Sequence, residues 1–265
     1  FVAPGNAGTA GEQKTRNIDI GVEDIQGLLD FSLDEQIDLC IVGPEVPLVM
    51  GIADRFADAG IRCFGPKKAA AQLEGSKAFA KQFLQRHSIA TAPYAEFSEL
   101  APAVEYVKQQ GTPIVIKADG LAAGKGVIIA QDEAQAIATL EDILEHSAFG
   151  GAGASVVIEA FLEGEEASFI CMVGVGRVLP LATSQDHKAA CEGDVGPNTG
   201  GMGAYTPAPV VDAEMYDKIM QQIIHPTLRG LEKDGLPYTG FLYAGVMIDD
   251  QGEPRVLEFN CRMGD

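Results

Sequence analysis

The sequence predicts a fold of mixed helices and strands, α/β over its first quarter and α+β over the rest. Short apolar strands alternate with amphipathic helices near the N-terminus, a glycine-rich strand-loop-strand segment covers Pro113–Ala130, and a late strand covers Arg255–Asn260. Strands that alternate with helices favour a parallel sheet, whereas two strands joined by a short glycine-rich loop favour an antiparallel pair.

An α/β unit is expected over residues 1–72. Its predicted elements are the end of a strand, a helix, a strand, a helix and a strand, at Phe1–Ala3, Val22–Leu33, Asp38–Val42, Pro47–Ala59 and Ile61–Phe64. The loops Pro4–Thr9 and Gly43–Pro47 follow strands, and open α/β sheets bind ligands at the carboxyl ends of their strands. Tight turns that require glycine and proline explain the same two loops equally well.

The second expected unit covers residues 73–265 and contains a lid-like α+β segment over about residues 91–161. Helices at Ala101–Gln110 and Asp132–His146 flank the glycine-rich hairpin in this segment. A helical stretch is expected to begin at Asp212. Pro226 must kink or restart it, because proline lacks the N–H group that an inner helical turn uses.

The glycine-rich segment has the composition of a phosphate-binding hairpin but fits neither of two common phosphate motifs. Three residues separate Gly120 from Gly124, Lys125 precedes Gly126, and a strand follows at Val127–Ala130, so the spacing and context of a Walker A loop are absent. A dinucleotide-binding fingerprint is absent as well. Glycine allows the backbone to approach phosphate oxygens closely. An ordinary flexible hairpin remains the alternative.

Two lysines favour the phosphate interpretation. Lys117 ends an apolar strand, where a buried lysine is costly unless it meets an anion. Lys77 follows Gly75 and Ser76, which resemble the cap of a helix over Ala78–Leu84. Its positive charge therefore lies at the positive end of the helix dipole, which is locally unfavourable, and a bound anion would offset this. Solvated surface lysines are the alternative interpretation.

The late strand carries the candidate metal ligands. Period-two alternation places Val256, Glu258 and Asn260 on one face, so a carboxylate and an amide oxygen point the same way. Oxygen ligands of this kind suit Mg²⁺. Arg262 lies just beyond and has the fork geometry that binds phosphate or carboxylate. A strand with one solvated face is the alternative.

Within Val156–Ser168, a further strand breaks into a short connector at Glu159–Leu162 and then meets three acidic residues, Glu163, Glu165 and Glu166. Backbone groups of such a connector are able to face an adenine edge, and a glutamate beyond it is able to accept hydrogen bonds from ribose. A solvated acidic turn is the alternative.

These elements occur in a fixed order and are joined by longer sequence signatures. The segments are EGSKAF (74–79), IKADGLAAGKGV (116–127), SQDHK (184–188), GPNTGGMGAY (196–205), TGFLYAG (239–245) and EFNCR (258–262). Their order resembles the ATP-grasp superfamily, and the segments resemble most closely its glycinamide ribonucleotide synthetase family. The resemblance covers essentially the whole chain. Ala189 departs from the family, which commonly has arginine there. Phe241–Met247 lacks the metal-binding glutamate that many ATP-grasp enzymes have, and the same is true of this family.

The resemblance implies a Rossmann-like pre-ATP-grasp unit followed by an ATP-grasp fold with a small lid subdomain. It also implies site residues. Those for ATP are Lys77, Lys117, Gly120, Gly124, Lys125, Gly126, Glu159, Phe161, Leu162 and Glu166. Those for the other substrates are Pro4, Gly5, Asn6, Glu45, Asp186, Asn198, Thr199, Gly200, Gly201, Met202 and Gly203. Glu258 and Asn260 would hold Mg²⁺, or alternatively Mn²⁺, and Arg262 and Lys117 would be catalytic.

The reaction implied by the resemblance belongs to purine synthesis. The carboxylate of glycine attacks the γ-phosphate of ATP to form glycyl phosphate, and the amine of 5-phosphoribosylamine then displaces phosphate. The family begins with a further strand and a glycine-rich turn and continues into a C-terminal domain. Neither is present in the sequence, so a fragment truncated at both ends is expected, and its own activity is in question.

Composition limits the choice of partners. The 265 residues include 38 acidic and 19 basic side chains, a net charge of −19, which argues against a nucleic-acid partner. No apolar run approaches the ~20 residues of a membrane span, and no secretory signal is visible. Five widely spaced cysteines predict free thiols and a cytoplasmic location. Small-molecule substrates are therefore expected, and the sequence carries no signal for oligomeric state.

Two alternative functions remain open. Another ATP-grasp carboxylate-amine ligase, or a carboxyphosphate-forming carboxylase, would share the ATP residues and differ in the 184–188 and 196–205 segments. A non-catalytic Mg-ATP-binding module would bind nucleotide without forming an amide. A nucleic-acid-binding or scaffold protein would leave the ordered phosphate and metal elements unexplained.

Overall fold

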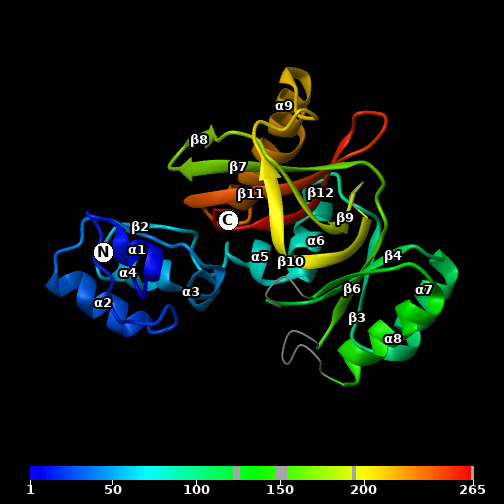
Figure 1. Ribbon diagram of the computed structural model, residues 1–265, viewed down its shortest axis with the longest axis horizontal. Coiled ribbons are helices and arrows are strands. Elements are labelled where there is room, and N and C mark those ends of the chain that lie inside the picture. Colours follow the sequence, from blue (N-terminus) through cyan, green and yellow to red (C-terminus); the bar gives the residue numbers. More distant parts are fainter. Residues whose placement is uncertain (122–125, 147–153, 193–194, 264–265) are drawn as a thin grey trace.

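The N-terminal unit is a small α/β assembly. The computed structural model describes residues 1–121, 126–146, 154–192 and 195–263. Strands β1 (Cys40–Ile41) and β2 (Cys63–Phe64) are parallel, as the sequence predicted, and Cys40 pairs with Cys63. Helices surround this pair on the blue side of the molecule (Figure 1). They are α1 (Ala7–Gly11), α2 (Ile25–Asp34), α3 (Glu45–Met50) and α4 (Ile52–Asp58).

Two predictions for this unit were wrong in detail. The strand expected at Phe1–Ala3 is a single parallel bridge between Val2 and Asn17. The helix expected at Pro47–Ala59 is two helices, because Gly51 has a φ of 99°, a left-handed conformation that glycine adopts without the steric cost of a Cβ.

The two loops predicted in this unit are also shorter than expected. Asn6 lies within the first of them and caps α1, with its side chain accepting a hydrogen bond from the Thr9 backbone N–H. The second loop ends where α3 begins, at Glu45. Both helices therefore start inside segments that glycine and proline had marked as turns.

The glycine-rich hairpin forms part of a four-stranded sheet in the order β3-β6-β4-β5. Its strands are β3 (Tyr94–Phe97), β4 (Ile114–Ala118), β5 (Val127–Ala130) and β6 (Val156–Ala160). Strands β4 and β5 are antiparallel, which confirms the predicted hairpin. Helices α7 (Leu100–Gln110) and α8 (Glu133–Leu144) pack on this sheet and share a hydrophobic core with it, seen at the lower right of Figure 1.

A second four-stranded sheet, in the order β12-β11-β7-β8, contains the predicted metal strand. Its strands are β7 (Glu165–Gly174), β8 (Arg177–Pro180), β11 (Gly240–Ile248) and β12 (Pro254–Asn260). The larger hydrophobic core includes side chains of this sheet and of α6 (Lys77–Arg86), together with side chains of α2, α3 and α4. The short helix α5 (Gln72–Gly75) leads into α6.

The helical stretch after Asp212 continues through its proline. Asp212 caps α9 (Ala213–Ile219), a π-helical turn covers Met220–Ile224, and α10 (His225–Lys233) begins with Pro226 in its first turn. Proline at an inner helical position removes one backbone hydrogen bond and crowds the preceding turn. The helical stretch does not stop at Pro226: a wider π turn precedes the proline, and α-helical geometry resumes around it in α10.

The 184–205 region forms an antiparallel pair, β9 (Gln185–Cys191) and β10 (Val195–Tyr205), whose register shifts twice. Glycines weaken the pattern by which strands are recognised, so the sequence did not predict these two strands. In the described ranges, none of the helices has the length and apolar character that a membrane span requires.

Candidate functional site

Lys117 lies in β4 and is buried, with only 6% of its surface exposed. Its Nζ lies 2.8 Å from Glu159 Oε1 and donates a hydrogen bond of 3.0 Å to the Leu257 carbonyl oxygen. The predicted buried lysine therefore meets a protein carboxylate, and it also connects the hairpin sheet to β12.

Glu159 was expected in the connector before β7 but lies in β6, with its side chain buried at 2% exposure. Its second oxygen, Oε2, lies 2.7 Å from Lys81 Nζ. One carboxylate is thus shared by two buried lysines. Ionised groups are rarely buried unless they are paired, and this cluster has two cations for one anion.

Lys81 was not predicted as a site residue. It lies in α6 four residues after Lys77, a spacing that puts both side chains on one face of the helix. Its Nζ donates to Thr91 Oγ1 at 2.6 Å, and that hydroxyl donates to the Val256 carbonyl oxygen at 2.7 Å. Burial lowers the pKa of Lys81 to about 8, against the opposing effect of Glu159.

Lys77 begins α6, as the sequence predicted, and Ser76 caps the helix by accepting a hydrogen bond from the Phe79 N–H. The Lys77 Nζ donates to the Gly120 carbonyl oxygen at 2.9 Å. Burial lowers the pKa of Lys77 below its usual range, and Glu258 acts in the opposite direction. A lowered pKa of this origin means that the charged ammonium lacks full compensation from the protein.

Asp119 is a second residue that sequence reasoning missed. Its carboxylate accepts hydrogen bonds from Ser76 Oγ at 3.0 Å and from the Ala78 N–H at 3.1 Å. It therefore places a negative charge at the N-terminus of α6, where the helix dipole favours one, and fixes the hairpin against that helix. Gly120, which follows, has a φ of 115°. Gly124 and Lys125 lie outside the described residues, whereas Gly126 is described as the residue before β5.

Glu258 and Asn260 lie in β12, as predicted, but the predicted face was wrong for Val256. The pairing of β12 with β11 shifts between Gly245 and Val246, which leaves Leu257 in a bulge. Val256 and Phe259 consequently both pack in the core, and Glu258 is exposed. Period-two counting fails at a bulge because one extra residue faces a single partner.

Arg262 lies just after β12 and faces two glutamates. Its Nε is 3.4 Å from Glu74 Oε1 and 3.8 Å from Glu45 Oε2. Glu74 also accepts a hydrogen bond of 2.7 Å from the Cys261 N–H. Burial raises the pKa of Glu74 to about 7, although that hydrogen bond and Arg262 oppose the shift. The sequence pattern identified Arg262 and Glu45 but not Glu74.

The connector between β6 and β7 contains Phe161, which is 37% exposed, and Leu162. Glu166 lies near the start of β7, opposite Met247, and its carbonyl oxygen accepts a hydrogen bond of 3.1 Å from Gln185 Nε2. Of the three acidic residues, Glu165 and Glu166 lie in β7, so the alternative of an acidic turn does not hold for these two.

Asp186 lies in β9 and accepts a hydrogen bond of 3.3 Å from Ser168 Oγ, which is also 2.7 Å from the Tyr243 hydroxyl. Gly203 pairs with His187 across β9 and β10. The remaining predicted residues of this segment lie in β10 with side chains outside the described set, and they are Asn198, Thr199, Gly200, Gly201 and Met202.

Pro4, Gly5 and Asn6 lie in the N-terminal unit. The Asn6 side chain forms part of the capping box of α1. The Asn6 backbone carbonyl oxygen accepts a hydrogen bond of 2.9 Å from Asn17 Nδ2. Gly5 has a φ of 77°, and a Cβ there would lie 2.2 Å from Asn17 Cγ. Gly5 and Asn6 therefore have defined local roles in the fold.

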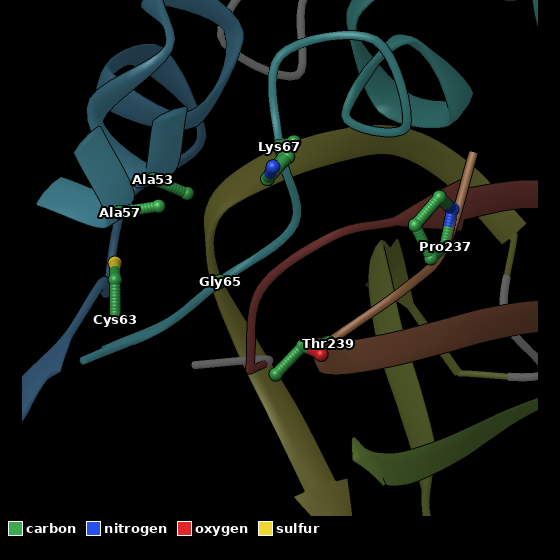
Figure 2. A pocket seen from close by; sticks show the side chains of 7 residues that line it. All are labelled: Ala53, Ala57, Cys63, Gly65, Lys67, Pro237 and Thr239. Carbon is green, nitrogen blue, oxygen red and sulfur yellow. The ribbon is translucent and has the colours of Figure 1, made fainter. Parts of the chain in front are cut away.

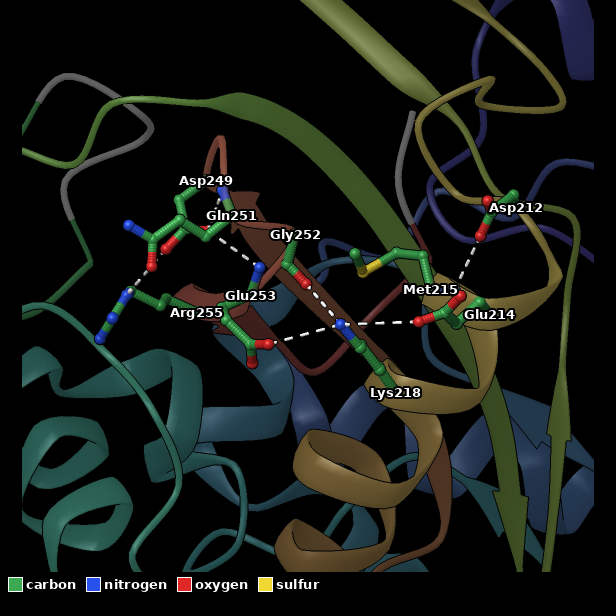
Figure 3. A network of polar contacts seen from close by, with 9 residues as sticks. All are labelled: Asp212, Glu214, Met215, Lys218, Asp249, Gln251, Gly252, Glu253 and Arg255. Atoms are coloured by element: carbon green, nitrogen blue, oxygen red, sulfur yellow. Dashed lines mark hydrogen bonds and ion pairs between the residues drawn. The ribbon is translucent and has the colours of Figure 1, made fainter.

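Two surface hollows lie away from the lysine cluster. One, of about 180 Å³, is lined by α4, β2 and the chain before β11, including Cys63, Lys67 and Thr239 (Figure 2). The other, of about 240 Å³, lies beside Lys218 and Gly252 (Figure 3). Neither lining includes a residue predicted for the site.

The donor set at β12 fits a hard divalent cation. Glu258 and Asn260 supply a carboxylate and an amide oxygen, and Mg²⁺ usually takes one or two carboxylates and completes its shell with water and substrate phosphates. Over the described ranges, no group of three or more His, Cys, Asp and Glu side chains is placed to hold a metal by itself. A magnesium ion there would need oxygens from a ligand or from water.

Family models match the chain in two consecutive parts. Residues 1–74 match the phosphoribosylglycinamide synthetase N domain, and residues 75–265 match the phosphoribosylglycinamide synthetase ATP-grasp (A) domain. Phosphoribosylamine–glycine ligases of Vibrio vulnificus strain YJ016 and of Allochromatium vinosum are each 62% identical over all 265 residues. The chain spans 62% of the length of each of these relatives.

Solved structures agree with these matches. A phosphoribosylamine–glycine ligase from Thermotoga maritima superposes with a TM-score of 0.83 at 35% identity, covering 99% of this chain and 62% of that one. A D-alanine–D-alanine ligase from Bacillus anthracis, at 20% identity, has a TM-score of 0.70 over 95% of this chain and 77% of that one, which shows the shared fold alone. The predicted ATP-grasp fold and the predicted family are confirmed.

Proposed function

Because this chain belongs to the phosphoribosylglycinamide synthetase family, we propose that it carries the nucleotide and magnesium site of a ligase that joins glycine to 5-phosphoribosylamine at the expense of ATP. The observation that carries the proposal is the Lys81–Glu159–Lys117 cluster, in which two buried ammonium groups share one carboxylate beside Glu258. An anionic ligand would balance the unpaired positive charge.

In this proposal Lys77 and Lys117 bind nucleotide phosphates, because the half-buried Lys77 reaches the hairpin and the buried Lys117 reaches β12. Gly120 and Gly126, with Gly124 and Lys125, would cover the phosphates. The sheet containing β4 and β5 would act as the lid. Phosphoryl transfer depends mainly on positioning and charge neutralisation, which is what such an arrangement supplies.

Glu258 and Asn260 would hold Mg²⁺, with Mn²⁺ as an alternative. Such an ion would supply positive charge that offsets the charge of the phosphates. Arg262 would then neutralise the transferring phosphoryl group, for which its release from Glu74 or Glu45 is needed, since both carboxylates now face its Nε.

The adenine and ribose would lie against the connector, with backbone groups at Glu159–Leu162 facing the base and Glu166 facing the ribose. Asp186 and the β10 segment Asn198–Gly203 would form the glycine and ribosylamine side, with Pro4–Asn6 and Glu45 nearer the sugar phosphate.

The reaction would proceed in two balanced steps. The carboxylate oxygen of glycine forms a bond to the γ-phosphorus while the bond from that phosphorus to the β-phosphate oxygen breaks, giving glycyl phosphate and ADP. The amine nitrogen of 5-phosphoribosylamine then attacks the acyl carbon, phosphate leaves, and the amine loses a proton. No covalent bond to the protein is needed.

The test is ADP release from Mg-ATP with glycine and freshly generated 5-phosphoribosylamine, each omitted in turn. Release that requires both substrates supports the ligase. Its loss in Lys117→Ala, but not in the exposed-site control Lys108→Ala, would connect the activity to the cluster. Parallel calorimetry should measure Mg-ATP binding by the same preparation.

A second candidate is a Mg-ATP-binding unit without ligase activity of its own, because the lysine cluster and the Glu258–Asn260 pair would serve nucleotide binding alone equally well. It predicts nucleotide binding without ADP release. If neither binding nor release occurs, the nucleotide assignment is wrong for this chain.

A further inference from the structure

We propose that Lys81 is a positioning residue that, together with Thr91, holds the phosphate lysine Lys117 and the metal strand β12 in one fixed arrangement. This inference rests on the proposed function, because it concerns the phosphate side of that site. It adds two residues, from α6 and from the segment before β3, to which no role in binding has been given above.

A continuous chain of polar contacts carries the inference. Thr91 Oγ1 donates to the Val256 carbonyl oxygen at 2.7 Å and receives a hydrogen bond from Lys81 Nζ at 2.6 Å. Lys81 Nζ continues to Glu159 Oε2 at 2.7 Å. Glu159 Oε1 lies 2.8 Å from Lys117 Nζ, which donates to the Leu257 carbonyl oxygen at 3.0 Å.

The two ends of this series of polar contacts therefore reach consecutive carbonyl groups of β12, those of Val256 and Leu257. Those carbonyls belong to the bulge, where the pairing between β12 and β11 shifts. A bulge leaves a residue without its regular strand partner, so donors from outside the sheet help to fix its conformation. The Val256 N–H, which donates to the Ala90 carbonyl oxygen at 2.8 Å, adds a third contact at the same place.

Glu258 follows the bulge directly, and Asn260 lies two residues later. The direction in which both side chains leave the strand depends on the conformation of the bulge. The contacts of Lys81 and Thr91 therefore act on the two proposed metal ligands through the backbone, and on Lys117 through Glu159.

Position in the fold separates positioning from direct binding. The Lys81 side chain is 4% exposed, contacts Thr91 and Glu159, and lies one helical turn farther into α6 than Lys77. Lys117 is buried to a similar degree, but it lies near the end of β4, beside the glycine-rich hairpin that would cover the phosphates. The charge of Lys81 still matters, because it occupies one oxygen of Glu159. Without Lys81, both carboxylate oxygens would be available to Lys117, and the carboxylate would compete with phosphate for that ammonium group.

Groups from four elements surround Lys81 Nζ. Glu159 lies on β6, Lys117 on β4 and Glu258 on β12, and all three influence its charge. The Tyr94 ring of β3 has its centroid 5.9 Å away. A substitution here therefore has to preserve shape while removing charge, which favours methionine over alanine.

The experiment compares Mg-ATP dissociation constants by calorimetry for the chain and for Lys81→Met, Thr91→Val and Thr91→Ser. We expect Lys81→Met to weaken binding about tenfold, as loss of a charge-assisted hydrogen bond would. Thr91→Val should weaken it about threefold, and Thr91→Ser, which keeps the hydroxyl, should bind like the unsubstituted chain. Lys108→Met, on the exposed face of α7, is the matched control and should leave binding unchanged.

Thermal unfolding of each variant separates a role in binding from a role in stability alone. If Lys81→Met does not fold, Thr91→Val and its rescue by serine decide the question. Unchanged dissociation constants in the folded variants, with lower melting temperatures, would overturn the positioning role and leave the proposed function standing. Failure of the unsubstituted chain to bind Mg-ATP would instead overturn the proposed function, and this inference with it.

Discussion

Two clusters of lysine and glutamate in this molecule have similar chemistry and very different surroundings. At the Lys81–Glu159–Lys117 cluster the side chains are 3–7% exposed and the ion-pair distances are 2.7 and 2.8 Å. At Lys218, the Nζ lies 3.4 Å from Glu253 and 3.9 Å from Glu214, and those carboxylate side chains are 48% and 82% exposed (Figure 3).

The difference shows what burial does to an ion pair. Water screens the Lys218 cluster, and exposed pairs contribute a median of about 0–1 kcal/mol to stability. In the buried cluster each charge depends on its partner, and removal of one partner leaves a desolvated charge behind. The buried cluster is therefore the one in which a ligand's charge would have a large effect.

The largest effect on the free energy of unfolding is expected for Glu159→Gln. It leaves Lys81 and Lys117 buried without a counter-charge, so the free energy of unfolding should fall by about 3–5 kcal/mol. Urea denaturation at pH 7 measures the change. A fall below about 1 kcal/mol would place this cluster in the same class as the exposed one.

Glu74 is an intermediate case, buried but in contact with the less buried Arg262, and its pKa is raised to about 7 from 4.5 by burial. A carboxyl group with a raised pKa in the folded state binds more protons there than in the unfolded chain between pH 4.5 and 7. Its contribution is present below pH 4.5 and is lost as the pH rises through 7.

Glu74→Gln should remove this contribution. The unfolding free energy of the unsubstituted chain should fall by about 2–3 kcal/mol more than that of the variant between pH 4.5 and 7.5. Denaturation series at these pH values measure the difference, and the exposed-site variant Glu105→Gln is the control. Parallel pH curves for Glu74→Gln and the unsubstituted chain would contradict the assigned shift.

A third change addresses ligand binding at the buried cluster. Lys117→Ala removes one of two cations and leaves Glu159 paired with Lys81, so the buried charges then balance. We expect Mg-ATP to bind at least about tenfold more weakly, or about 1.4 kcal/mol, without unfolding of the chain. Calorimetry measures the affinity and circular dichroism the fold. Unchanged affinity would remove the support for a nucleotide at the hairpin.

Local signals in the sequence were enough to predict several of the elements that surround the buried Glu159 cluster. The hairpin, the Ser76 cap and the β12 strand each depend on neighbouring residues, and the structure confirms them. Glu159 and Lys81 are 78 residues apart, and their contact depends on how β6 packs against α6. No local pattern marks that pairing, which is why Lys81 was missed and Glu159 was placed in the connector.

The bulge and the β9–β10 pair were not predicted for a related reason. Strand alternation assumes that each residue faces one partner in the neighbouring strand. Leu257 has no such partner, because the consecutive β11 residues Gly245 and Val246 pair with Glu258 and Val256. The glycines of β10 removed the apolar alternation by which strands are recognised. Both features depend on a neighbouring strand whose position a local pattern does not contain.

The smallest effect on the free energy of unfolding is expected for a substitution in the exposed Lys218 cluster. Lys218→Met removes the ammonium group that donates to the Gly252 carbonyl oxygen at 2.9 Å and faces Glu253. Because the cluster is open to water, the unfolding free energy should fall by less than about 1 kcal/mol, and added salt should shrink the difference further by screening. Urea denaturation at low and high ionic strength tests both points. A loss as large as that expected for Glu159→Gln would mean that exposure to water does not distinguish the two clusters. A small, salt-sensitive loss would mean that burial is the property by which the Glu159 cluster differs.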